Sequence, residues 1–433
     1  MAGIFKSIDQ SDIRVTPFQS HKLWSDSALS YRYTTSSLTS YPVTRMFANW
    51  HTSNQQDNTF YVLSTNPLNQ DQHTLYRIDG EEDFQSLAEF SASYAFSNIE
   101  QTNSKILAFT SNSVENSVYI LNYELTAETS YSINISPLEI YDTCFIDTFS
   151  YKFVGMKSAS GCLGLFEAAS VYDWTNPDAA GDYWGVDSTS DNNLCTLFKS
   201  GSDVYLAVYM PSTPGYVKSG PFPIGPQPTE IKDFFVYQSD PLGSGSGGTI
   251  WMLFSDHTLY LSDFDTMDVT NLGLTDVAAI LLDNDYYVSS INTYQTQRVH
   301  IITRSGLVYL DAHYDYLNET LVVGAELDLR SHIGSGLGNV VQSATINRNA
   351  QTTGDGDAII SIIAGTNSGI NESIFVTVNT NTQEIGNPTH LGSVKSTTYI
   401  LGYNSTRVYA ADSGSSINVS TGGFKNNWYT FNL

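Results

Sequence analysis

One pattern recurs along this 433-residue chain: an apolar segment, a short polar turn, and a second segment that opens with an aliphatic–aromatic pair. The clearest copies are 250–254 followed by Leu259-Tyr260, and 299–302 followed by Val308-Tyr309. A repeat with a period of about 20 to 50 residues is the signature of solenoids and propellers, and it constrains the fold more than any other feature. The pair occurs eight times, at Leu75-Tyr76, Val118-Tyr119, Leu165-Phe166, Val204-Tyr205, Leu259-Tyr260, Val308-Tyr309, Ile374-Phe375 and Val408-Tyr409.

The spacing of these pairs matches the size of a propeller blade. Steps between the aromatic residues are 43, 47, 39, 55, 49, 66 and 34 residues, with a mean of about 48. Three or four antiparallel strands fit into such a step, and radially packed sheets of that size form β-propellers. Each pair follows an apolar strand, at 60–63, 106–109, 153–156, 194–198, 250–254, 299–302, 359–363 and 399–403, and several copies carry a further strand, as at 45–50, 234–237, 287–291 and 340–346.

We therefore predict an all-β fold, with a β-propeller of about eight blades over residues 46–433. The aromatic residues of the pairs are expected to pack between neighbouring sheets. The irregular last two steps leave seven blades with an atypical closing unit as an alternative. Two or three β-sandwiches in series are a second alternative, which the regular period disfavours. The terminal segment 428–431 reads as a last strand that seals the ring and leaves the first 45 residues free.

Proline and glycine interrupt the repeat at one place. Six of the 13 prolines lie between 211 and 228, and a Gly/Ser stretch follows at 243–248. Dense proline disfavours a strand ladder, because proline has no N–H to donate. We predict a loop insertion at about 211–248, either a contact surface or a tolerated excursion.

The charge balance excludes several classes of function. Charged residues make up 15% of the chain, and the formal net charge is −25. Such a surface repels phosphate backbones and anionic lipids, so we expect no direct nucleic-acid binding. No apolar run is long enough for a membrane span, so no membrane insertion is expected. Cys144, Cys162 and Cys195 have neither zinc-site nor disulfide-framework spacing and are expected to be buried thiols.

No arrangement of residues predicts catalysis or a metal site. None of the eight histidines falls in a zinc-protease pattern, and the Gly/Ser run at 243–247 lacks the strand–turn–helix setting of a nucleophile. Acidic turns at 283–285 and 355–357 do not complete a calcium loop. The segment 420–428 is a degraded relative of the structural Asp-box turn. Acidic clusters that could serve a propeller glycosidase are expected by chance among 44 acidic residues; they are Asp173, Asp182 and Asp187 near Trp174 and Trp184, and Asp263, Asp265 and Asp268.

The opening segment differs from the rest of the chain. Residues 1–45 carry a net charge of +2, against −27 for the remainder. Apolar side chains that lie outside the repeat need a surface to cover them. We predict an N-terminal docking arm over 1–45, and the alternative is an edge strand that completes a blade. The residues expected to bind a partner are Phe5, Ile8, Ile13, Val15, Phe18, Lys22 and Trp24.

The run 11–18 (SDIRVTPF), with Lys22 and Trp24 shortly after it, resembles the openings of structural proteins of tailed bacteriophages, the crAss-like group in particular. The resemblance covers about the first 25 residues. It implies a virion component assembled in the bacterial cytoplasm and held in the tail by its arm. The implied partners are other tail proteins (hub, nozzle or fibre), with several copies around the tail axis.

The predicted function is thus a non-enzymatic structural component of a phage tail: a nozzle, muzzle or fibre adaptor without a cofactor. The alternative is a propeller that binds or cleaves glycans at the host surface.

Overall fold

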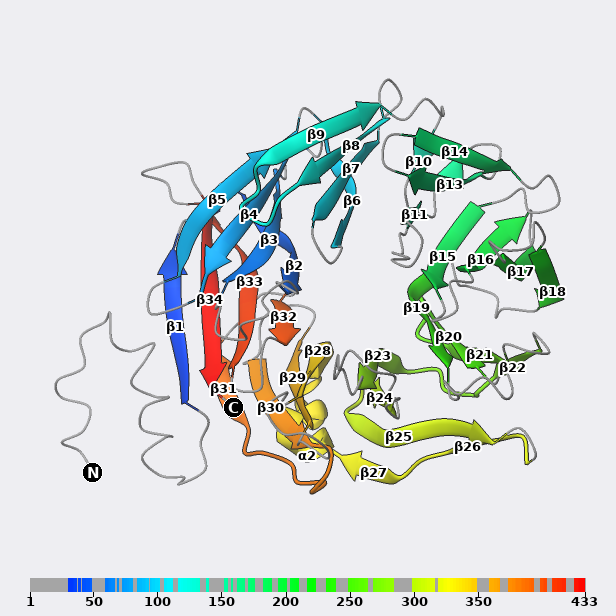
Figure 1. Ribbon diagram of the computed structural model, residues 1–433. Helices are drawn as coiled ribbons and strands as arrows, with labels where there is room; N and C mark the ends of the chain where they lie inside the picture. Colours follow the sequence, from blue (N-terminus) through cyan, green and yellow to red (C-terminus); the bar gives the residue numbers. More distant parts are fainter. Residues whose placement is uncertain are drawn as a thin grey trace, which may run out of the picture.

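Small antiparallel sheets follow one another around a closed ring, so the chain folds as a β-propeller (Figure 1). The computed structural model describes residues 30–36, 38–39, 41–48, 59–66, 68–69, 72–80, 84–92, 94–101, 105–111, 116–132, 138–139, 152–154, 157–158, 162–167, 170–175, 182–188, 194–200, 203–209, 216–222, 231–238, 248–263, 268–283, 298–315, 318–348, 358–366, 373–392, 398–402, 407–417 and 424–432.

Five sheets have the regular form of a blade: four strands that are consecutive in sequence lie side by side, the first nearest the centre of the ring and the fourth at its rim. They are β2 (Val43–Ala48), β3 (Thr59–Thr65), β4 (His73–Asp79) and β5 (Gln85–Ser91); β6 (Phe96–Gln101), β7 (Ile106–Ser111), β8 (Asn116–Leu121) and β9 (Ala127–Ser132); β15 (Asp182–Ser188), β16 (Leu194–Ser200), β17 (Asp203–Tyr209) and β18 (Tyr216–Phe222); β19 (Ile231–Gln238), β20 (Gly248–Phe254), β21 (Leu259–Asp263) and β22 (Val269–Asn271); and β28 (Val340–Arg348), β29 (Ala358–Gly365), β30 (Ser373–Asn379) and β31 (Thr389–Gly392).

The other sheets depart from this form. One sheet has five strands: β23 (Val277–Asp283), β24 (Arg298–Thr303), β25 (Leu307–Asp315), β26 (Thr320–Val322) and β27 (Ala325–Asp328). Between β9 and β15 lie a three-stranded sheet of β11 (Lys152–Val154), β13 (Cys162–Glu167) and β14 (Ser170–Thr175), and a two-stranded sheet of β10 (Leu138–Glu139) and β12 (Lys157–Ser158).

The two ends of the described chain build the last sheet together. Its order is β1 (Ser30–Ser36), β34 (Phe424–Asn432), β33 (Arg407–Ile417) and β32 (Thr398–Gly402), with β1 on the outside. β1 pairs antiparallel with β34 from Ser30↔Asn432 to Ser36↔Asn426. The predicted arm over 1–45 is therefore wrong from residue 30 onward. The physical reason is that β34 would otherwise expose an unpaired edge, and only a strand from the other end of the chain covers it.

The aliphatic–aromatic pairs lie on equivalent strands in most sheets. Six of them are on the third strand from the inside, in β4, β8, β17, β21, β25 and β30, and Leu165-Phe166 is on the middle strand β13. Val408-Tyr409 instead lies on β33, the second strand of its sheet. That difference explains the short step of 34 residues. The long step of 66 residues contains β26, β27 and the helical turns α2 (Arg330–Ile333) and η2 (Ser335–Leu337).

No helix in the described part of the chain is long and apolar enough to cross a membrane.

Buried side chains join each sheet to the next. Tyr409 from β33 stacks on Phe60 from β3, with ring centroids 4.9 Å apart, and Trp428 lies in the same cluster. Phe375 of β30 stacks on Phe431 of β34, with ring centroids 3.8 Å apart, and so joins the sheet β28–β31 to the last sheet. The prediction that the paired aromatic residues pack between sheets is confirmed at these positions. Cys195 is a buried free thiol, as expected, in a cluster that spans β15–β18 and β19–β22.

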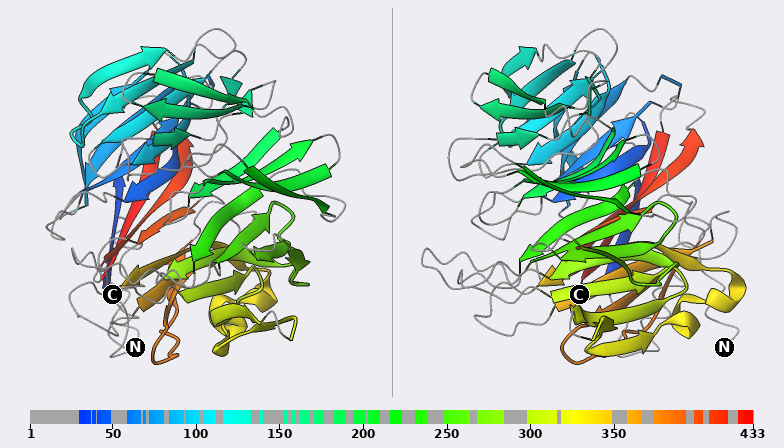
Figure 2. Two further views of the ribbon diagram at one scale, coloured as in Figure 1. Left: turned by 45° about the vertical axis from the view of Figure 1, so that its right-hand side comes forward. Right: turned by 90° about the vertical axis from the view of Figure 1, so that its right-hand side faces the viewer.

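A bend in β25 brings part of its sheet into contact with the neighbouring sheet β19–β22. Asp311 has a φ of 52°, and the register of β25 with β24 shifts there. The first half of β25 pairs with β27 and the second half with β26, so the β25–β26 hairpin extends along the rim (Figure 1). Tyr314, Leu321 and Val323 of this hairpin pack in one cluster with Trp251 of β20. Figure 2 shows α2, in yellow, standing out at one face of the ring.

The predicted loop insertion at 211–248 is wrong in part. Tyr216–Phe222 forms β18, an outer strand, and Ile231–Gln238 forms β19, the first strand of the next sheet. Pro221 is tolerated because it lies on a sheet edge, at a point where the register between β17 and β18 shifts. The other five prolines and the Gly/Ser stretch at 243–247 lie outside the described residues.

We predict that Gly80→Ala lowers the free energy of unfolding by about 1–3 kcal/mol, the usual cost of overpacking a core. A Cβ at Gly80 would lie 2.4 Å from Cε1 of Tyr409, whose side chain is fully buried between sheets. The control is Gly336→Ala, because a Cβ there has no atom within 4 Å. Urea denaturation measures both variants, and equal stabilities would contradict the packing described for Tyr409.

Candidate functional site

The predicted partner-binding residues lie outside the part of the chain that the structure describes. They are Phe5, Ile8, Ile13, Val15, Phe18, Lys22 and Trp24. What the structure gives is their point of attachment. The chain enters the ring at Ser30, the first residue of the outermost strand, beside Asn432.

The acidic clusters named from the sequence are spread over different elements. Asp173 and Trp174 lie on β14, whereas Asp182, Trp184 and Asp187 lie on β15 of the next sheet. Asp263 and Asp268 flank a hairpin turn, where the amide of Asp263 donates to the carbonyl oxygen of Asp268 at 3.2 Å. Asp265 and the turns at 284–285 and 355–357 fall outside the described residues, and Asp283 ends β23. Among the described residues no three His, Cys, Asp or Glu side chains gather around a common point.

The structure instead brings together three basic residues, Lys232, His257 and Arg304, which we call the basic cluster. Lys232 is the second residue of β19, and its ammonium donates a hydrogen bond to the carbonyl oxygen of Ala278 on β23. His257 lies in the turn between β20 and β21, with a φ of 69°. Its Nδ1 is 2.9 Å from the carbonyl oxygen of Val277. Two neighbouring carbonyl groups of β23 thus fix two of the three side chains.

Backbone hydrogen bonds hold the turns that carry His257 and Arg304. The amide of Val277 donates to the carbonyl oxygen of His257 at 3.0 Å, and the amide of Val341 donates to that of Arg304 at 2.9 Å. In both cases the turn after the second strand of one sheet is bonded to the start of the next sheet. Asp276 adds to this, because its carbonyl oxygen accepts from the Arg304 amide at 2.7 Å and its Oδ2 accepts from the Ser305 amide at 3.0 Å.

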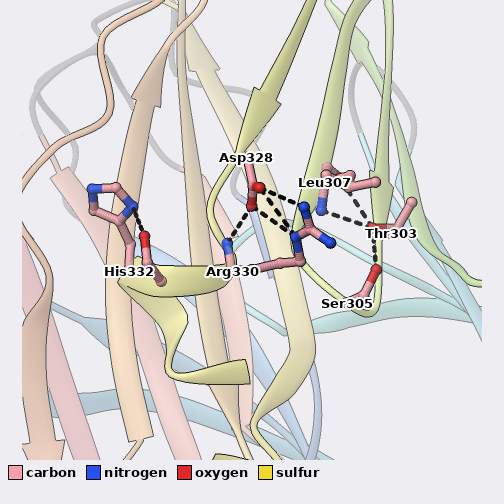
Figure 3. A network of polar contacts seen from close by, with 7 residues as sticks. Thr303, Ser305, Leu307, Asp328, Arg330 and His332 are labelled. Atoms are coloured by element: carbon pink, nitrogen blue, oxygen red, sulfur yellow. Dashed lines mark hydrogen bonds and ion pairs between the residues drawn. The ribbon is translucent and has the colours of Figure 1, made fainter. Parts of the chain in front are cut away.

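Side chains inside the 303–307 turn tighten it further (Figure 3). The hydroxyl of Thr303 lies 3.0 Å from that of Ser305 and accepts a 2.8 Å hydrogen bond from the Leu307 amide. The amide of Leu329, just before α2, donates to the carbonyl oxygen of Gly306 at 2.8 Å. The position of Arg304 is therefore set by a rigid turn.

Burial and neighbouring positive charge lower the pKa values of Lys232 and His257. For Lys232, burial is the main cause of a lowered pKa, the charge of Arg304 adds to it, and Asp233 opposes it. For His257, burial again lowers the pKa, the hydrogen bond to Val277 raises it, Arg304 and Lys232 lower it, and Asp276 raises it. A carbonyl oxygen can only accept, so the neutral imidazole carries its proton on Nδ1 and leaves the Nε2 lone pair available.

A neighbouring ion pair has a different character. Asp328 and Arg330 form a bidentate pair at the start of α2, with Nη2 of Arg330 2.6 Å from Oδ2 of Asp328 and Nε 3.0 Å from Oδ1 (Figure 3). Hydrogen bonds from Arg330 hold the pKa of Asp328 at about 2. Both side chains are exposed, and Arg330 is already matched by a carboxylate. This pair has little charge left for a ligand.

Sequence reasoning missed the basic cluster. Lys232, His257 and Arg304 are spread over 72 positions and follow no motif. The only available signal was the turn after each second strand, which the repeat located at 255–258 and 303–306 without indicating what the turn would contact.

We predict that His257 makes folding sensitive to mild acid. Its pKa is below the ordinary 6.5 in the folded chain, so the unfolded chain binds a proton more readily. The stability present above about pH 6.5 is lost as the pH falls through the lowered folded value. Between pH 7 and 5 the free energy of unfolding should therefore drop more in the wild type than in His257→Asn, which tolerates the same left-handed backbone. Chemical denaturation at each pH measures this free energy, and an equal drop in the wild type and in His257→Asn would refute the prediction.

The chain was compared with known protein families, curated proteins and solved structures. No family model and no curated protein matches the chain. Among solved structures, it is similar to the WD40 domain of Pan2 from Neurospora crassa, at 10% identity and a TM-score of 0.44 over 80% of this chain and 91% of that one. It is also similar to a europium-containing methanol dehydrogenase, at 10% identity and 0.47 over 92% and 93%. The propeller domain of Myceliophteria thermophila Cps50 (Swd1) matches at 8% identity and 0.41 over 77% and 98%. Such low identities concern the fold alone, and the propeller assignment rests on the sheet topology above.

Proposed function

We propose that this chain is a non-enzymatic structural component of a phage tail, a propeller ring tied to neighbouring tail proteins by the segment that precedes β1. The observation that carries the proposal is the closure of the ring by β1. Because β1 is the outermost strand of its sheet, residues 1–29 join the ring at its rim. A segment attached there is placed to reach a neighbouring protein.

The content of that segment supports the same role. Its apolar residues lie outside the repeat, and its three basic side chains (Lys6, Arg14 and Lys22) balance its three acidic ones, whereas the remainder of the chain is strongly acidic. A segment of this kind gains binding energy by ordering on a partner. The resemblance of the run 11–18 to phage tail proteins gives the assembly in which the partner would be found. A nozzle, muzzle or fibre adaptor position, with several copies around the tail axis, fits a ring with one lateral attachment.

The described ionisable groups support a structural role. His257 and Lys232, whose pKa values are shifted, are both bonded to the backbone of an adjoining sheet. The shifts accompany contacts that hold the ring together.

We further propose that the ring has eight blades. Seven sheets of four or five strands are described, and the three-stranded sheet β11–β13–β14 occupies the remaining interval between β9 and β15. The period of about 48 residues agrees with one blade there. An experimental structure at side-chain resolution would check the count. We expect residues 133–181 to form one blade, and two blades or none in that interval would refute it.

We predict that deletion of residues 2–24 removes the chain from virions and leaves the ring folded. The deletion spares β1, so thermal unfolding should stay within a few degrees of the full chain. In phage particles that carry each version, quantitative mass spectrometry should find several copies of the full chain and none of the deleted one.

The control deletion extends through residue 36 and takes β1 away. It should lower the free energy of unfolding by at least about 3 kcal/mol, since several backbone hydrogen bonds of about 1 kcal/mol each are lost. Normal incorporation of the shorter deletion would contradict the proposed attachment. Release of oligosaccharide from host polysaccharide by purified protein would favour the glycan-cleaving alternative.

A further inference from the structure

The basic cluster is unusual in a chain with 19 basic and 44 acidic residues. Its three members come from two adjoining sheets, β19–β22 and β23–β27, and meet where the first sheet contacts the start of β23. Lys232 lies on the innermost strand, where much of the residue is open to solvent although its ammonium is partly desolvated at the carbonyl group of Ala278. His257 and Arg304 are half-buried in turns at the same face of the ring. Each is held by an element that other hydrogen bonds fix, so a ligand would find the group already assembled.

Several other basic side chains of the described chain face carboxylates. Arg77 pairs with Glu124, Lys105 with Glu128, and Arg330 with Asp328. The basic cluster differs, because Lys232 bonds to a backbone carbonyl group and Arg304 has no ion pair with any described residue. Of the two nearby carboxylates, Asp276 accepts from the Ser305 amide, and Asp233 follows Lys232 in the strand.

We propose that Lys232, His257 and Arg304 form a binding site for a carboxylate carried by an acidic side chain of a neighbouring protein. The Arg304 guanidinium can bind the two oxygens of a carboxylate side by side, and the Lys232 ammonium has two donors left after its bond to Ala278. A bound anion would also favour the protonated imidazole of His257, whose Nε2 would then donate. The positive charges that repel one another in the free protein would be neutralised.

A carboxylate fits this site better than a phosphate chain. Asp233 and Asp276 lie beside the cluster, and both act on its charges. A ligand with one negative charge meets the two cations without strong repulsion from these carboxylates, whereas a nucleic acid or polyphosphate brings many charges close to a surface of net −25. The inference rests on the proposed function in one respect, namely that the carboxylate belongs to an adjacent tail protein.

The test uses the purified full chain and a hexapeptide with blocked ends and an uncharged fluorescent label, which carries a single Glu among Gly and Ser residues; binding is measured by fluorescence anisotropy at low ionic strength. The test variant is Lys232→Gln/Arg304→Gln. The matched control is Lys105→Gln/Arg330→Gln, which removes the same charge from residues that already have carboxylate partners. We expect the test variant to bind at least about tenfold more weakly than the wild type and the control to stay within about twofold.

A second measurement needs no variant. In NMR spectra of histidine-labelled wild-type protein, the peptide with one Glu should raise the pKa of His257, while the version with Gln in place of that Glu should not. The resonances of His332, on α2, should be unaffected by either peptide.

Three results would overturn the inference: no binding by the wild type at millimolar peptide, equal losses in the two double variants, or an unchanged His257 titration in saturating peptide. Displacement of the peptide by inorganic phosphate or a DNA oligonucleotide at lower concentrations than by unlabelled peptide would replace the carboxylate with a phosphate ligand. Because the assay uses isolated protein, its outcome is separate from the virion test of residues 2–24.

Discussion

The antiparallel pairing of β1 with β34 is the contact on which the rest of the ring depends. In a propeller each sheet is covered on both faces by its neighbours. An incomplete last sheet would leave a gap in the ring and expose the aromatic clusters between sheets. Here the last sheet takes its outer strand from the beginning of the chain and its three inner strands from the end. That arrangement holds Trp428 and Phe431 buried against the sheets on either side. It also fixes where the leading segment leaves the ring.

Much of the fold could be predicted from the sequence, because each blade repeats the same local chemistry. Apolar second strands and aliphatic–aromatic third strands, such as Leu75-Tyr76, report burial on both faces of a sheet and are readable within a few residues. The closing strand was not readable in this way. Its sequence, SYRYTTS, carries no repeat signal, and its partner lies almost 400 residues away. Pro221 misled for a related reason: a proline on a sheet edge costs no ladder hydrogen bond, and only the tertiary structure shows which edge is outside.

The candidate site illustrates the same limit more strongly. Hydrogen bonds to the carbonyl groups of Val277 and Ala278 and to the backbone of Asp276 bring Lys232, His257 and Arg304 together. No spacing rule joins them, because the distance along the chain reflects the lengths of intervening strands. The repeat could locate the turns on one face of the ring, but the charges that converge there depend on how neighbouring sheets are placed. The same contacts stabilise the ring, and among the described residues the guanidinium of Arg304 has no ion-pair partner.

The mixed origin of the last sheet has a consequence for the order of events during synthesis. β1 leaves the ribosome before any other described strand, and β34 leaves it last. Until β34 has been synthesised, β1 lacks its native partner, so the ring cannot close before that strand emerges. Nascent chains of intermediate length therefore present β1 with unpaired backbone groups, which favours chaperone contact before the ring is complete.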